Sequence, residues 1–281
     1  MEFRSSARPS PIAGTWYTSD KQILAAEMDT FLDEAKISVD EIQGEVVGLI
    51  SPHAGHRYSG RTAGYAYRTV KGQERDLVVI LSPFHQYSPG ELITTAFHAY
   101  ETPLGNVEVD VDLLSKLAEK LKNKGILIHQ ISNDPEHALE IQLPFLQRAL
   151  KGNFKLLPLM VRTRDPIILQ TIASEVFEAI KDKSFLLVAS TDLSHFFPLD
   201  IAEKMDAEML RVIKDMDPEG VLFAEQDGIA AACGASSVAA VLWMALKAGA
   251  GKTYILNYST SADATGDRTS VVGYGAAAIV R

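Results

Sequence analysis

Three short apolar runs, each ending in a polar turn that carries histidine, constrain this chain more than any other feature. Buried-strand patterns cover residues 46–51, 76–82 and 185–189, and amphipathic helical patterns lie between them. Apolar runs of this length that alternate with helices are typical of buried parallel strands. The sequence therefore predicts an α/β fold, with a central, mostly parallel sheet and helices on both faces.

The chain shows no obvious division into separate domains. Its 281 residues contain no internal repeat, no low-complexity tract and no linker long enough to divide the chain. We therefore expect a single domain over residues 1–281. Residues 1–20, which are punctuated by prolines and a glycine, are expected to form an irregular arm that Trp16 and Tyr17 anchor on the body.

Composition narrows the class of protein. The chain has 27 basic and 36 acidic residues, a net charge of −9, which argues against nucleic acid and anionic membranes as partners. The first residues lack the apolar core of a signal peptide, and the most apolar helical stretch, residues 235–250, is too short to span a bilayer. The single cysteine, Cys233, excludes an internal disulfide. We expect a cytoplasmic protein.

Polar residues capable of chemistry follow the three predicted strands. His53 comes just after the first strand and His85 just after the second, while Asp192 and His195 follow the third. In open α/β sheets, ligands bind at the carboxyl ends of the strands. Asp192 and His195 are three residues apart, so one helical turn would place them on the same side.

These residue types suit a metal site, although a simpler interpretation exists. Neutral imidazole is the commonest protein ligand for transition metals, and carboxylate or thiolate completes many such sites. Cys233 precedes a predicted helix, where a thiol ionises more easily. Alternatively, each histidine is a capping or surface residue, because the spacing matches no short metal signature. The pattern alone leaves both interpretations open.

The segment from Asp134 to Glu140 also has two interpretations. Asp134-Pro135-Glu136 is typical of a helix start, where acidic residues favour the positive end of the helix dipole. His137 and Glu140 would then be a solvated pair one helical turn apart. The other interpretation places both of them in the pocket.

Five motifs occur in an order that resembles a known family: Pro52-His53-Ala54-Gly55, Pro83-x-His85, Glu136-His137-x-x-Glu140, Ser190-x-Asp192-x-x-His195 and Cys233-Gly234. The set resembles the Memo-like family, the middle partner of a grouping with AMMECR1-like and radical SAM proteins. The resemblance covers nearly the whole chain. It implies an extradiol-dioxygenase-like fold, similar to that of ring-cleaving enzymes that use non-haem ferrous iron.

The resemblance also implies a site. The expected metal is iron, with copper or zinc as alternatives, and its implied ligands are His53, His85 and Cys233. The other implied pocket residues are Asp192, His195, His137 and Glu140. Dioxygenase relatives use two histidines and one carboxylate, whose place Cys233 takes. Since a thiolate changes metal preference and redox behaviour, ring cleavage is not carried over. Gln142, where some relatives have histidine, is not counted as a ligand.

Three functions fit these residues. The first is a metal-dependent redox enzyme of unknown substrate, in which His195 is the general acid or base and Asp192 orients it or contacts the metal. The second is a non-enzymatic protein whose pocket binds a peptide, a metabolite or a partner, since one fold hosts many functions. The third is a hydrolase, because a metal with an open position activates water. Expected partners are a small-molecule or peptide ligand and the AMMECR1-like and radical SAM proteins.

Overall fold

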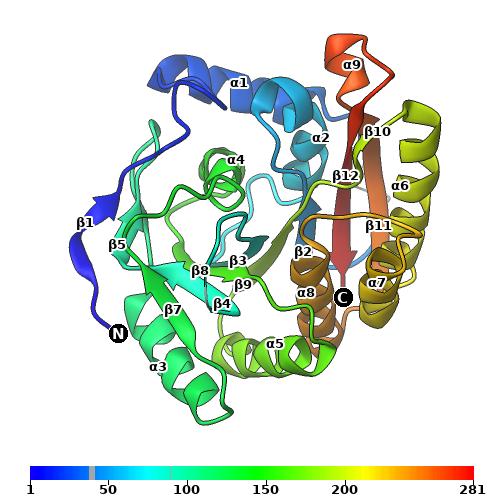
Figure 1. The fold of residues 1–281 in the computed structure, drawn as a ribbon. Coiled ribbons are helices and arrows are strands. Elements are labelled where there is room, and N and C mark those ends of the chain that lie inside the picture. The colour runs from blue at the N-terminus through cyan, green and yellow to red at the C-terminus, as the bar shows by residue number, and fades with distance from the viewer. Residues whose placement is uncertain (38–41, 89) are drawn as a thin grey trace.

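The computed structural model describes residues 1–37, 42–88 and 90–281, and a nine-stranded sheet lies at the centre of this region of the chain (Figure 1). Its strands are β2 (Val46–Ser51), β3 (Leu77–Pro83), β4 (Leu92–Thr95), β7 (Ile128–Ile131), β8 (Lys155–Val161), β9 (Phe185–Ser190), β10 (His195–Phe197), β11 (Lys252–Thr260) and β12 (Val271–Val280). The order is β10-β12-β2-β9-β3-β8-β4-β7, and β11 pairs with β12.

The direction of the strands confirms the α/β prediction and refines it. The central strands β2, β9, β3 and β8 are parallel and almost fully buried, as their continuous apolar runs indicated. However, β12 is antiparallel to β2 and β11, and β4 is antiparallel to β8. The sheet is therefore mixed rather than purely parallel. One reason is that only residues 261–270 join β11 to β12, too few for the crossover that a parallel pair requires.

Helices cover both faces of the sheet, as predicted (Figure 1). On one face lie α1 (Lys21–Glu34), α2 (His56–Arg68) and α4 (Leu143–Ala149), the last entered through a 3-10 turn, η2 (Glu140–Gln142). The other face carries α3 (Val111–Lys122), α5 (Pro166–Ile180) and α8 (Ala235–Lys247). Beside them α6 (Leu199–Lys214) packs on β11 and β12, and α7 (Pro218–Gln226) packs on α6 and α8. The short helix α9 (Ala262–Thr265) lies in the link between β11 and β12.

The N-terminal arm is more regular than predicted. Residues Arg4–Arg8 form β1, which runs parallel to β5 (Phe97–Tyr100), and β5 pairs with β6 (Val107–Glu108) in a second, three-stranded sheet. The expectation of an irregular arm was wrong here, because the mostly polar β1 is held through its backbone and has no apolar alternation to reveal it. Tyr17 is buried and does anchor the arm.

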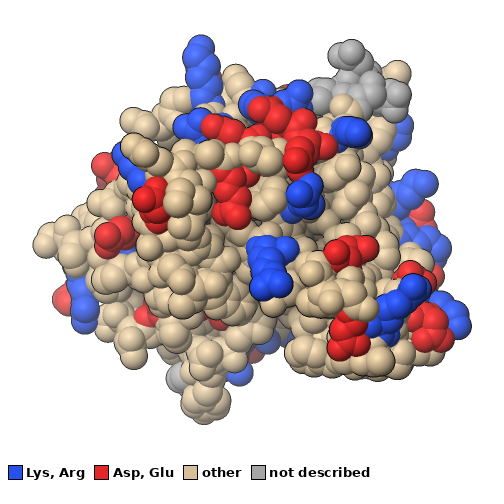
Figure 2. Space-filling view, turned by 90° about the horizontal axis from the view of Figure 1, so that it is seen from above, with Lys and Arg blue, Asp and Glu red and all other residues tan. Residues whose placement is uncertain are grey.

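The surface mixes charges of both signs. In the face shown in Figure 2, lysines and arginines are interspersed with aspartates and glutamates over the helices. Among the described residues, every helix is too short or too polar to cross a membrane.

Candidate metal centre

Three histidine side chains meet at the carboxyl edge of the parallel strands. His53 follows β2, His85 follows β3, and His137 lies just before η2. One ring nitrogen from each lies within 4.8 Å of the others, and the ring centroids are 4.9 to 5.4 Å apart. These three side chains are called the imidazole cluster below. The structure thus brings together His53 and His85, the two predicted histidine ligands, and adds His137.

Each ring of the imidazole cluster is held by its Nδ1 atom. His53 Nδ1 lies 3.0 Å from Ser190 Oγ, at the end of β9. One oxygen of Glu136 lies 2.9 Å from His85 Nδ1 and 3.2 Å from His137 Nδ1. A polar partner on one ring nitrogen fixes the orientation of a metal-binding histidine and directs the other nitrogen to the metal. The Nε2 atoms of His85 and His137 are therefore left to bind an ion, and the Nε2 atom of His53 faces the Cys233 sulfur.

Glu136 is the residue whose role the sequence did not reveal. Its carboxylate is 1% exposed and also accepts hydrogen bonds from the backbone N–H groups of His85, His137 and Ala138. Although burial alone would raise it, the hydrogen bond from His85 and the nearby imidazoles lower the pKa of Glu136 to about 2. The helix start that was one interpretation of this segment is wrong, since helical structure begins only at Glu140.

The protonation of the cluster suits a metal ion. Burial, followed by the proximity of His85, lowers the pKa of His53 to about 3, and burial with His53 nearby lowers that of His137 to about 4. Burial also acts against charge on His85, but the bond to Glu136 raises its pKa. Two of the rings are thus neutral at neutral pH, the form that binds metal. This donor set fits a transition metal with imidazole preference.

Cys233 lies beside the imidazole cluster. Its Sγ atom is 3.1 Å from His53 Nε2 and 3.4 Å from the backbone nitrogen of Asp192. Burial, and then the charge of Asp192, raise the pKa of this thiol. Burial therefore acts against the easier ionisation expected next to α8. The predicted third ligand is close to His53, while the triad within 4.8 Å consists of imidazoles.

Asp192 and His195 both line the cavity in front of the imidazole cluster, but they are not related by a helical turn. Residues 191–194 are not helical, and His195 begins β10. The Oδ1 atom of Asp192 accepts hydrogen bonds from the backbone nitrogens of His53, at 2.7 Å, and Ala54, at 3.3 Å. Burial raises the pKa of Asp192 to about 6. The residue therefore fixes the turn that carries His53.

The cavity in front of the imidazole cluster has a volume of about 460 Å³ and is called the metal cavity below. Besides the three histidines, its wall includes Asp192, His195, Trp16, Tyr58, Val272 and Tyr274. The indole of Trp16 packs on the His137 ring, with centroids 4.0 Å apart. Trp16 was expected only to anchor the arm, and nothing in its sequence context indicated this contact.

Two residues of the family motifs lie behind the metal cavity. Glu140, expected in the pocket, is fully buried and does not line the cavity. Its carboxylate instead contacts Arg8 and Ser10 and accepts a hydrogen bond of 2.6 Å from the Tyr17 hydroxyl. Gln142 donates through Nε2 to Ser190 Oγ, at 2.8 Å, and so supports the partner of His53.

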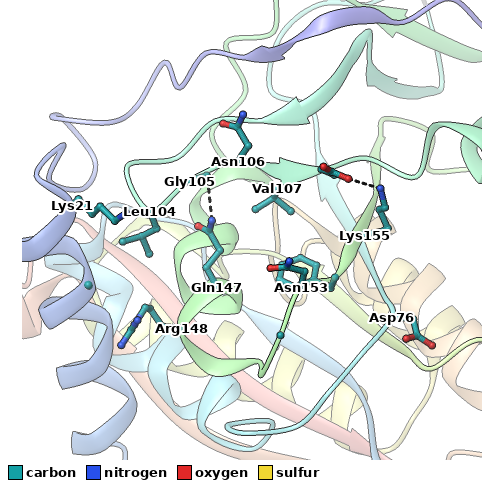
Figure 3. A pocket seen from close by; sticks show the side chains of 14 residues that line it. Lys21, Asp76, Leu104, Gly105, Asn106, Val107, Gln147, Arg148, Asn153 and Lys155 are labelled. Atoms are coloured by element: carbon teal, nitrogen blue, oxygen red, sulfur yellow. Dashed lines mark hydrogen bonds and ion pairs between the residues drawn. The ribbon is translucent and has the colours of Figure 1, made fainter.

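A second cavity, of about 520 Å³, lies between the start of α1, β6 and the loop after α4 (Figure 3). Two of its basic residues already have partners: Lys155 pairs with Glu108, and Arg148 binds Asp29 at 2.7 to 2.9 Å. None of the predicted site residues lines it. The chemistry of this chain is therefore concentrated in the metal cavity.

Comparison with known proteins gives a clear family match. The model of a family described as Memo-like protein matches residues 8–278. This chain belongs to the Memo-like family. The matched region includes every residue of the imidazole cluster, so the Memo-like match covers the whole site. Membership confirms the resemblance found in the sequence.

Memo-like relatives match over nearly their full length. A MEMO1 family protein of Nitrosopumilus maritimus is 34% identical over 272 residues, which cover 96% of this chain and 98% of the relative. A MEMO1 family protein of Saccharolobus solfataricus is 32% identical, with 95% and 96% covered. One from Thermoplasma volcanium is 31% identical, with the same coverage.

Proposed function

We propose that this Memo-like protein is a metal-dependent redox enzyme that acts on a small organic substrate in the metal cavity. The observation that carries the proposal is the imidazole cluster, in which every Nδ1 has a protein partner, His85 and His137 keep Nε2 for a ligand, and His53 Nε2 faces the Cys233 sulfur, itself a metal-binding atom. Iron is the proposed metal, with copper and zinc as alternatives that the same donors accept. When bound, iron or copper would supply electron transfer and positions for substrate, whereas zinc would supply only the positions.

The residues of the chain have distinct tasks in this proposal. His53, His85 and His137 hold the metal, and Cys233 contributes its sulfur from beside His53. His195, on the wall of the same cavity, holds or moves a proton at its ring nitrogen. Asp192 is a positioning residue, because its carboxylate binds the backbone of the His53 turn.

The test is metal stoichiometry in single variants. Purified protein is loaded anaerobically with ferrous iron or with copper, desalted and assayed for metal content. We expect one metal per wild-type chain and loss of that metal in His53→Ala. Comparison of His137→Ala with Cys233→Ala then shows whether imidazole or sulfur is the third ligand. His98→Ala is the matched control, since His98 is an exposed histidine outside the site.

Two outcomes would overturn the proposal. Stoichiometric binding that survives both His53→Ala and Cys233→Ala would remove the assigned ligands. Metal that binds as proposed, without oxygen consumption or substrate oxidation that depends on His195, would leave a metal site but no redox enzyme.

A further inference from the structure

Two of the described residues other than glycine have a positive φ, and local structure explains only one of them. Met216, at φ 57°, follows α6, and the Asp217 backbone nitrogen donates to the Val212 oxygen, as in helices that end with a left-handed residue. Phe196, at φ 64°, lies inside β10, where a bulky side chain rarely adopts this conformation. The strain at Phe196 therefore calls for another explanation.

That strain coincides with an irregularity in strand pairing. The register between β10 and β12 shifts between His195 and Phe197, so Phe196 is bulged out of the ladder. Bulges next to sites redirect a side chain. Phe196 is 74% exposed, and its ring lies 5.8 Å, centroid to centroid, from the ring of His195. Core packing does not account for it, and strained residues of this kind cluster at ligand sites.

The Phe196 ring lines a further cavity that adjoins the metal cavity. This outer cavity has a volume of about 300 Å³ and shares three wall residues with the metal cavity: Tyr58, Val272 and Tyr274. Its far wall is formed by the link between β11 and β12, including Ser261 and Asp267. The two cavities therefore adjoin along one shared wall. Together they are called the groove below, with the imidazole cluster at one end and Phe196 at the other.

Tyr274 stands where the two cavities join. It is 2% exposed, and among the described residues its hydroxyl has no hydrogen-bond partner. The hydroxyl is not one of the fully enclosed orphaned atoms either, so it is accessible from the groove. Water can therefore bind this hydroxyl, and only a ligand group that hydrogen-bonds equally well replaces such a water without loss of affinity. A ligand oxygen at the junction of the cavities would take the place of that water.

We propose that the groove binds an elongated organic acid. Its oxygen anion lies at the imidazole end and accepts a hydrogen bond from Tyr274, and its apolar or aromatic arm lies in the outer cavity against Phe196. The metal end of this ligand rests on the proposed function, whereas the arm end rests on Phe196 and the outer cavity alone. Phe196 is thus a specificity-determining residue that distinguishes ligands with an arm from those without one.

The experiment compares two carboxylates that differ only in the arm. Protein loaded with Co²⁺ is titrated with acetate and with 4-phenylbutyrate, and each dissociation constant is read from the visible absorption of cobalt. We expect 4-phenylbutyrate to bind at least about tenfold more tightly than acetate, because the arm buries apolar surface. Phe196→Asn should abolish that advantage and leave acetate binding unchanged. Tyr274→Phe should weaken both carboxylates about fivefold, the value of one hydrogen bond.

A stability measurement separates ligand binding from a structural role. Asparagine tolerates a positive φ better than phenylalanine does, so Phe196→Asn should keep or raise the midpoint of thermal unfolding. The same variant should lose the tighter binding of the ligand that has an arm. A purely structural Phe196 would lower the midpoint on substitution. Phe223→Ala is the matched control, since Phe223 is another exposed phenylalanine, on α7, outside the groove.

The outcomes distinguish this inference from the proposed function. Equal affinities of the wild type for the two carboxylates, or an advantage that survives Phe196→Asn, would overturn the inference while the metal site stands. If Co²⁺ does not bind, the proposed function fails. Saturation-transfer NMR of 4-phenylbutyrate on the metal-free protein then tests whether the phenyl arm binds in the outer cavity. A phenyl signal that Phe196→Asn removes supports the outer cavity, and a signal that is absent or unchanged by it overturns the inference.

Discussion

Two polar clusters share the segment from Asp134 to Glu140, and they differ in what they leave unpaired. In the Arg8 network, formed by Arg8, Asp134 and Glu140, each guanidinium nitrogen has an acceptor: Asp134, Glu140 or the Glu136 backbone oxygen. Arg8 is 1% exposed, and its guanidinium also lies 4.9 Å from the centre of the Tyr100 ring. In the imidazole cluster, by contrast, only Nδ1 of His85 and of His137 has a protein partner, and the second nitrogen of His53 faces the Cys233 sulfur. The Arg8 network, whose guanidinium is fully paired, is suited to stabilise the fold. The imidazole cluster, which keeps ring nitrogens without a protein partner, is suited to bind a ligand.

The largest effect should follow from removing the cation of the Arg8 network. Arg8→Ala leaves two buried carboxylates without their partner, which should cost about 3–5 kcal/mol of unfolding free energy. Urea denaturation measures this loss. Arg4→Ala, on the exposed end of the same strand, is the control and should cost far less. Similar losses of unfolding free energy in both variants would show that the Arg8 network is not the main interaction that holds the N-terminal arm on the protein.

The next effect should fall on the imidazole cluster. Glu136→Gln keeps the shape of the side chain but removes the charge that orients His85 and His137. Metal affinity should fall about 10- to 100-fold, as for other residues that support metal ligands. Calorimetric titration with Zn²⁺ measures it, and Glu101→Gln, an exposed glutamate, serves as the control. Unchanged affinity would mean that the rings are oriented without Glu136.

Acidity should sharpen the difference between the two clusters. Burial raises the pKa of Asp134 and of Glu140, and Arg8 opposes that rise. Without Arg8 both values should rise further, so the folded protein would keep protons that the unfolded chain releases above about pH 4. The stability of Arg8→Ala should therefore fall as pH rises, and its deficit against wild type should be about 1–2 kcal/mol larger at pH 7 than at pH 4. Denaturation curves at both pH values test this, and a constant deficit would contradict it.

The smallest effect should come from the edge of the Arg8 network. Tyr17→Phe removes the hydroxyl that donates to Glu140 and should cost about 1 kcal/mol. Metal affinity should stay within twofold of wild type, because Glu140 does not line the metal cavity. Thermal denaturation and the same calorimetric titration provide both numbers. A large loss of metal affinity would show that the two clusters are coupled.

The edge of the sheet could be predicted from the sequence because its signals are local. An apolar run followed by Pro52 marks the end of β2, and the equivalent run before His85 marks the end of β3. Once these strands are parallel, both histidines must lie at one edge. The direction of β12 could not be predicted in this way, because it depends on a short connection rather than on the residues of the strand.

The pairings around residues 134–140 could not be predicted in the same way. An acidic residue near a proline favours a helix start whether its carboxylate points outward or, like Glu136, into a site. Arg8 and Glu140 are 132 positions apart, and no local pattern indicates that they meet. Likewise β1 is held by backbone pairing with β5, which leaves no periodicity in its side chains.

The contact between Trp16 and His137 gives the protein an intrinsic optical reporter. The chain has two tryptophans, and the other, Trp243, is buried in α8. An ion arriving on the neighbouring imidazole should quench the emission of Trp16, while that of Trp243 provides a steady background. Metal binding can thus be followed in unlabelled protein by fluorescence, and Trp16→Phe should remove the change in emission on metal binding.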